Sequence, residues 1–141
     1  MAGPKPLRLL AQDAEDLAVI SAALQDAVLR VGDIVFEPSL RRLTLALNRY
    51  RWEAGDGERV RAGLQLAGVL KVQTRKVKRG APEAVLELLA VTFTPGEPPG
   101  GTVTFSFAGG ADLRASVECV EAVLADVSRP WSARRQPAHD V

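Results

Sequence analysis

The residues best suited to binding chemistry in this 141-residue chain form a short basic segment. It holds five of the 18 Lys and Arg residues within nine positions, namely Lys71, Arg75, Lys76, Lys78 and Arg79. Clustered cationic groups attract phosphates, nucleic acids and acidic proteins. At a strand edge, the same residues are also typical of a solvated border that resists aggregation. The segment predicts an anion or partner patch or a protected edge, and the second interpretation is favoured.

Aromatic residues offer a second candidate. Tyr50 and Trp52 alternate with Arg49 and Arg51, a pattern found on surfaces that stack single-stranded nucleic acid. Burial of both aromatic rings in the core is the favoured interpretation. Trp131, near the end of the chain, is a candidate partner contact, although an indole that folds back onto the core is the slightly favoured interpretation.

Nucleophilic catalysis would depend on Cys119, the only cysteine. A thiol at the start of a helix can become a reactive thiolate. Glu118 and Glu121 place negative charge on both sides of it, which opposes that ionisation. The only histidine, His139, lies in the polar C-terminal tail and is a poor general base. We therefore predict no catalytic residues and a protein that is not an enzyme.

Metal and cofactor binding find no better support. One His and one Cys far apart do not make a zinc site. The carboxylates of Asp13, Glu15 and Asp16 are explained by capping of a helix N-terminus. The glycine pairs at 100–101 and 109–110 lack the context of a phosphate-binding loop. We expect no metal and no cofactor.

Composition limits the class of protein. The apolar fraction of 47%, the charged fraction of 25% and the net charge of +1 suit one globular domain over residues 1–141. We expect an ordered core over about 7–131 and loose tails at 1–6 and 132–141. A lone cysteine suits a reducing compartment, and no apolar run is long enough for a signal peptide or a membrane span. We expect a cytoplasmic protein without membrane insertion.

The element that should organise the fold is the segment 102–127. Residues 102–108 and 113–118 alternate in polarity around the glycines at 109–110, which predicts a β-hairpin. Val120, Val123, Leu124 and Val127 then recur at helical spacing, which predicts a closing helix with Leu124 buried against the sheet.

The preceding chain supplies the rest of that sheet. Helical spacing after Asp13 predicts a helix over 14–26. The ranges 34–37 and 42–52 predict a hairpin, with a register shift near Asn48. The range 60–77 predicts a long strand bent at Gly68. Residues 84–94 are apolar on both faces, so they are either a buried strand or begin as a helix.

These elements predict an α+β fold. About seven antiparallel strands would form a strongly bent sheet or small barrel, with an N-terminal helix and a C-terminal helix that caps one end. This arrangement resembles the pleckstrin-homology-like superfold, which does not require the N-terminal helix. The alternative is an open antiparallel sheet with both helices on one face.

Three longer segments carry a family resemblance. They are DAEDLAVISAALQDAVLRVGD at 13–33, LNRYRWE at 47–53 and FAGGADLRASVECVEAVLAD at 107–126. With them, the chain from about residue 7 to 137 resembles a family of small alphaproteobacterial proteins known only as a domain of unknown function. The resemblance implies no established activity, cofactor or site.

The function that best fits a globular core without clustered polar chemistry is a non-enzymatic binding or adaptor domain. Its partner would be another protein or a second copy of the chain. The alternative is binding of nucleic acid or another anion through residues 71–79.

Overall fold

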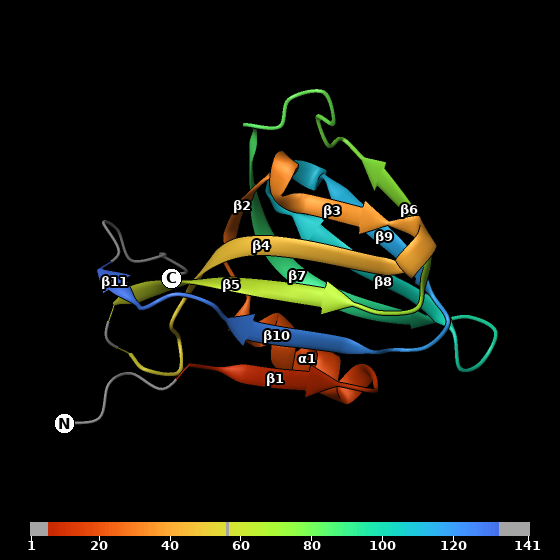
Figure 1. Cartoon of the computed structure of the whole chain (residues 1–141), viewed down its shortest axis with the longest axis horizontal. Coiled ribbons are helices and arrows are strands. Elements are labelled where there is room, and N and C mark those ends of the chain that lie inside the picture. Colours follow the sequence, from red (N-terminus) through yellow and green to blue (C-terminus); the bar gives the residue numbers. More distant parts are fainter. Residues whose placement is uncertain (1–5, 56, 133–141) are drawn as a thin grey trace.

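Eleven β-strands dominate the structure (Figure 1). The computed structural model describes residues 6–55 and 57–132. In chain order its elements are β1 (Arg8–Ala11), α1 (Ala14–Ala23), β2 (Val28–Arg30), β3 (Ile34–Glu37), β4 (Arg42–Tyr50), β5 (Glu58–Leu66), β6 (Val69–Arg75), β7 (Val85–Pro95), β8 (Gly101–Phe107), β9 (Asp112–Val117), β10 (Ala122–Asp126) and β11 (Trp131–Ser132). Single turns of 3-10 helix lie at 31–33, 38–40 and 108–110.

All strands join one antiparallel sheet that curls without closing. The strand order is β1-β10-β5-β4-β2-β7-β8-β9-β6, with β3 also paired to β4 and β11 also paired to β5. Figure 1 shows β4, β5 and β10 in front of β7 and β8, with α1 at the lower side. The curl brings the two halves of the sheet face to face, so one core fills the space between them.

Period-2 alternation decides which side chains fill this core. Leu43, Leu45 and Leu47 of β4 are fully buried, whereas the residues between them are partly exposed. Leu64 pairs across with Leu45 on one side and with Leu124 on the other, so one row of leucines crosses three strands. Phe105 of β8 is also fully buried. Such rows are stabilised by the apolar area that they remove from water.

The helix α1 closes one side of the core. Asp13 caps its N-terminus by accepting a hydrogen bond from the Asp16 backbone N–H at 2.8 Å, as its sequence predicts. Leu17, Ile20 and Leu24 are buried. The helix ends at Ala23, three residues before the predicted end, because the chain turns through Asp26 at φ 65° to enter β2. No helix in the described ranges is long and apolar enough to cross a membrane.

The predicted C-terminal helix is wrong. Residues 122–126 form β10, which lies between β1 and β5 and pairs with both. In five residues, the buried Ala122 and Leu124 fit a strand as well as a helix, and Val127 is 68% exposed. The backbone groups of β5 and β1 supply partners that only a strand can use, and tertiary pairing therefore overrides the local spacing.

The predicted fold class is wrong for the same reason. One helix instead of two, 11 strands instead of about seven, and an unclosed sheet exclude the pleckstrin-homology-like arrangement within the described residues. They also exclude the alternative with two helices on one face. Antiparallel pairing, and the hairpins β3–β4 and β8–β9, are confirmed.

Three strand predictions are refined. The register between β4 and β5 runs without interruption from Leu43 to Tyr50, so the predicted shift near Asn48 is wrong. The range 60–77 divides into β5 and β6 at Gly68, which adopts φ 66°, and β6 pairs with β9 instead of continuing along β4. Residues 85–95 are strand throughout, which excludes the helical alternative. The short strands β2 and β11 were not predicted.

Candidate functional site

The basic segment lies at one end of the strand order. Its first two members, Lys71 and Arg75, belong to β6. They point outward, since exposed and partly buried residues alternate from Lys71 to Arg75. Lys76 follows at φ 57°, which turns the chain out of the sheet, and Lys78 and Arg79 lie in the connection to β7. All five side chains are exposed.

The fold separates these five cations instead of gathering them. Arg75 forms an ion pair with Asp112 of β9, with Nη2 and Oδ2 3.3 Å apart. The Nζ atom of Lys76 lies beside Gly110, only 3.7 Å from where a Cβ at that glycine would stand. Arg79 instead lines a pocket. The segment therefore does not form one flat cationic surface.

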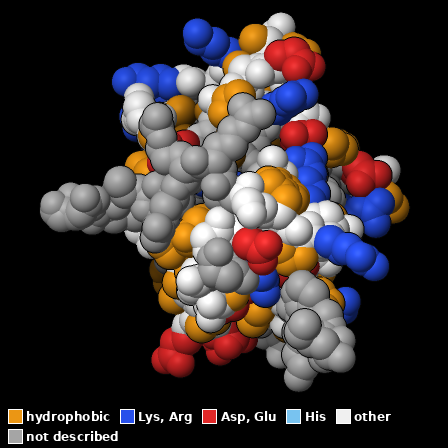
Figure 2. Space-filling model, turned by 90° about the vertical axis from the view of Figure 1, so that its left-hand side faces the viewer, with side chains coloured by type: hydrophobic (Ala, Val, Ile, Leu, Met, Phe, Trp, Pro, Cys, Tyr) orange, Lys and Arg blue, Asp and Glu red, His pale blue; other side chains and the backbone are white. Residues whose placement is uncertain are grey.

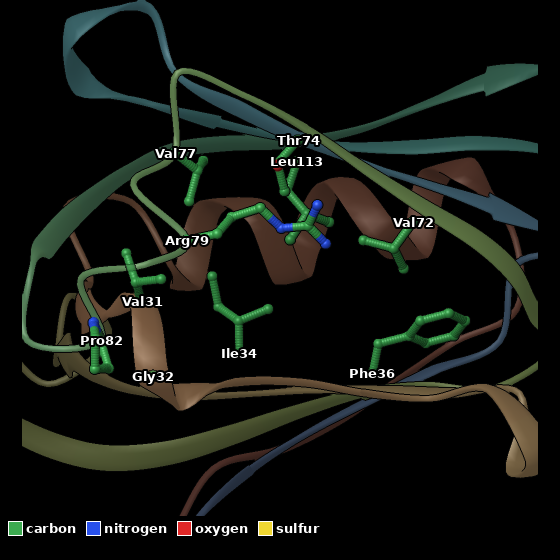
Figure 3. A pocket seen from close by; sticks show the side chains of 10 residues that line it. All are labelled: Val31, Gly32, Ile34, Phe36, Val72, Thr74, Val77, Arg79, Pro82 and Leu113. Carbon is green, nitrogen blue, oxygen red and sulfur yellow. The ribbon is translucent and has the colours of Figure 1, made fainter.

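The pocket that Arg79 lines lies between β3 and β6 and has a volume of about 430 Å³ (Figure 3). Its apolar wall consists of Val31, Ile34, Phe36, Val72, Val77 and Leu113. Thr74 and Arg79 are the polar side chains of the lining, and Arg79 is the charged one. Figure 3 shows the Arg79 side chain reaching across the middle of the pocket, between Ile34 and Leu113.

Backbone hydrogen bonds fix both ends of this pocket. At one end, the Val69 N–H of β6 donates to the carbonyl of Arg41 at 2.8 Å, next to an ion pair between Arg41 and Glu118. At the other end, the Gly32 N–H donates to the carbonyl of Pro82 at 2.9 Å. A side chain at Gly32 would stand only 3.1 Å from the Pro82 Cβ, so this close approach favours glycine.

A second pocket, of about 450 Å³, lies near the ends of β2 and β4. It is lined by Arg30, Arg61, Asp33 and Asn48. Its arginines already have partners, since Arg61 lies 3.4 Å from the Asp33 carboxylate and Arg30 lies 3.1 Å from that of Glu83. Paired charges leave less attraction for a ligand, so the pocket between β3 and β6 is the stronger candidate.

Arg49, part of the predicted aromatic and basic pattern, belongs to a buried ion cluster. It occupies the inward row of β4 after Leu47, and its side chain is 0% exposed. Its guanidinium donates to both carboxylate oxygens of Asp126 at 2.8 Å and to those of Glu53 at 2.9 and 2.7 Å. Asp126 also accepts from the Leu7 backbone N–H at 2.8 Å. The cluster joins the ends of β4 and β10.

Burial and hydrogen bonding oppose each other in this cluster. Burial would lower the pKa of Arg49, but its hydrogen bonds to Asp126 and Glu53 prevail and raise that pKa. The hydrogen bonds from Arg49 lower the pKa of Glu53, against the effect of partial burial. Both groups are therefore held in their charged forms. No feature of the sequence indicates this burial, since an arginine in a strand is ordinarily exposed.

Tyr50 and Trp52, the aromatic residues of the predicted stacking pattern, contact each other. The Tyr50 and Trp52 ring centroids are 4.5 Å apart, and Tyr50 is buried. The Trp52 Nε1–H donates to the carbonyl of Gln25 at 2.9 Å. Trp131 pairs through its backbone with Arg59 of β5, and the residue is 40% exposed.

The remaining candidates for chemistry are not brought together. Cys119 lies half-buried in the connection between β9 and β10, and the helix expected to activate it does not exist. His139 lies outside the described residues, as do residues 1–5 and 133–141 of the predicted tails. Within 6–55 and 57–132, no three His, Cys, Asp or Glu side chains are grouped as a metal ion requires.

Charges on the face that carries β11 are mixed. Figure 2 shows basic, acidic and apolar side chains interspersed on this face, without a large area of one sign.

The sequence predicted Arg79 as a binding candidate, within the basic segment. The sequence did not predict the apolar wall contributed by Ile34 and Phe36, because such residues cannot be told from core residues in a sequence.

Comparison with known proteins identifies a family for this chain but no function. No curated protein and no solved structure matches it significantly. A family model does match, over residues 7–139, and it is described as a protein of unknown function, DUF2948. The match spans nearly the whole sequence, and the chain belongs to the DUF2948 family.

Proposed function

We propose that this protein is a non-enzymatic binding domain whose ligand occupies the pocket between β3 and β6. The observation that carries the proposal is one charged side chain, Arg79, across a pocket otherwise walled mainly by apolar residues. A volume of about 430 Å³ suits a ligand of moderate size. The ligand would combine an apolar group, which fills the pocket, with an anionic group that meets Arg79.

A comparison of Arg79 with the arginines of the second pocket supports this role. No carboxylate within the described residues pairs with it, in contrast to the arginines of the second pocket. Its guanidinium is therefore available to a carboxylate or phosphate, which it can bind through two parallel hydrogen bonds. The apolar wall around it would strengthen that attraction by excluding water.

The competing proposal is a nucleic-acid interface formed by residues 71–79. Such an interface needs several cations that follow one phosphate backbone. Here Arg75 is paired with Asp112, Lys76 is directed toward Gly110 and Arg79 toward the pocket. This divergence favours a small anionic group over a nucleic-acid strand.

The test is a fluorescence titration with dansyl-labelled undecanoic acid, which has an apolar chain and one carboxylate. We expect saturable binding that weakens as salt rises. Arg79→Gln should weaken it by about fivefold to tenfold, between the value of an exposed ion pair and that of a charge-assisted hydrogen bond.

Two further variants sharpen the test. Val72→Trp should abolish binding, because the indole would fill the pocket. Lys78→Gln is the matched control, since it removes a neighbouring charge that does not line the pocket. Equal loss in Arg79→Gln and Lys78→Gln would indicate general electrostatic attraction, and binding unchanged in Val72→Trp would exclude this pocket.

A further inference from the structure

Two strands border the pocket with unpaired edges. β6 ends the strand order and pairs only with β9, and β3 pairs only with β4 among the described residues. Apart from the Val69 N–H, which donates to the Arg41 carbonyl, each strand therefore presents a row of backbone N–H and C=O groups toward the other across the pocket. Such an edge is a template for an added strand.

The side chains of β6 set the pattern that an added strand must match. Val72 and Thr74 point into the pocket, whereas Lys71, Gln73 and Arg75 point outward. Neighbouring strands place their side chains on the same two faces, so alternate residues of an added strand would enter the pocket. The residues between them would lie beside Lys71 and Arg75 on the outer face.

We infer that the occupant of this pocket is an extended acidic peptide segment of another protein, added as a strand along the edge of β6. The inference rests on the proposed function and specifies its ligand. Apolar side chains at every second position would fill the pocket. Acidic side chains at the positions between would lie on the outer face, where Arg75 is already paired with Asp112 and Lys71 supplies the attraction. A further carboxylate would meet Arg79.

Charge complementarity selects this partner over a second copy of the chain. Two β6 edges brought together would bring Lys71 and Lys76 of one copy near those of the other, which like-charge repulsion disfavours. An acidic strand replaces that repulsion with attraction. The pocket is also anchored at both ends by backbone hydrogen bonds, so its rims are set before a peptide arrives.

The experiment uses the full chain and a fluorescein-labelled heptapeptide in which Glu alternates with Leu and Val. Fluorescence anisotropy should show saturable binding, which a peptide of the same composition without alternation should lack. Two versions of the peptide carry N-methyl groups on alternate residues, one for each edge of the peptide. Pairing with β6 predicts that at least one version loses binding by more than about tenfold, since its strand edge can no longer pair.

Reversing one charge tests the contact between Lys71, on the outer face of β6, and the acidic residues of the peptide. Lys71→Glu should weaken binding of the acidic peptide by about fivefold. It should strengthen binding of a peptide in which Lys replaces Glu. Lys78→Gln, outside β6, should change neither.

The outcomes separate the inference from the proposed function. If the dansyl-labelled acid binds and the peptide does not, or if both N-methylated peptides bind as well as the parent, the strand addition is wrong and the proposed function stands. If neither probe binds, both are wrong. A single-stranded oligonucleotide of equal charge that binds more tightly and displaces the peptide would also overturn the inference.

Discussion

Two arginines of this protein, Arg49 and Arg79, differ in their burial and in their ion-pair partners. Arg49 is fully buried and holds two carboxylates, Asp126 and Glu53, through paired hydrogen bonds. Arg79 crosses an open pocket and has no carboxylate partner within the described residues. The charge of Arg49 is neutralised within the fold, whereas that of Arg79 lines a pocket without such a partner among the described residues. Charge alone therefore does not mark a candidate binding site, and the presence or absence of an internal partner distinguishes the two arginines.

The largest effect should follow from removing the buried charge. Arg49→Met would leave the Asp126 side chain, only 2% exposed, without its counterion. Breaking one partner of a buried ion pair costs about 3–5 kcal/mol. We expect that loss in the free energy of unfolding, measured by urea denaturation.

Two companion variants make this prediction sharper. Arg79→Met should change the unfolding free energy by less than about 0.5 kcal/mol, as is usual for an exposed side chain. The double variant Arg49→Met with Asp126→Leu should recover part of the stability, because an apolar pair can replace a buried ion pair. Equal effects of Arg49→Met and Arg79→Met would remove the distinction between the two regions.

A second prediction compares apolar truncations in the same two regions. Leu124 of β10 is fully buried and pairs with Leu9 and Leu64, so Leu124→Ala should cost about 2–5 kcal/mol through lost burial and a cavity. Val72 lines a pocket that is already open, so Val72→Ala should cost less than about 1 kcal/mol. Denaturant midpoints measure both. Similar losses of stability would show that Val72 contributes to the folded state as much as a core residue does.

The smallest effect concerns the pH dependence of the buried cluster. The pKa of Glu53 is lowered from its ordinary 4.5, so its carboxylate stabilises the folded state above that value. This stabilisation is lost as the pH falls from about 4.5 through the lowered pKa. Because the Glu53 side chain is 42% exposed, we expect its contribution to be only about 1 kcal/mol.

Unfolding at several pH values measures this contribution as the difference between the parent and Glu53→Gln. The difference should be constant near neutral pH and should shrink below pH 4.5. Glu83→Gln is the control, because its pair with Arg30 is exposed on both sides and should contribute almost nothing. A difference that grows as the pH falls would contradict the assignment.

Local features of the sequence determined much of the secondary structure. The sequence predicted a helix capped by Asp13 and a hairpin around Gly109 and Gly110. Both are confirmed. These features depend on contacts between residues close in the chain, or on a periodicity that persists over several residues. The bend at Gly68 follows from the same kind of local signal.

Tertiary structure alone decided the rest. The segment 122–126 is a strand because β1 and β5 offer backbone partners from 100 or more and about 60 residues away along the chain. Arg49 is buried because Asp126, 77 residues later, neutralises it. The pocket exists because β3 and β6 are neighbours that do not pair. Local spacing cannot encode these outcomes, since each depends on which distant groups meet and on whether their polar atoms find partners.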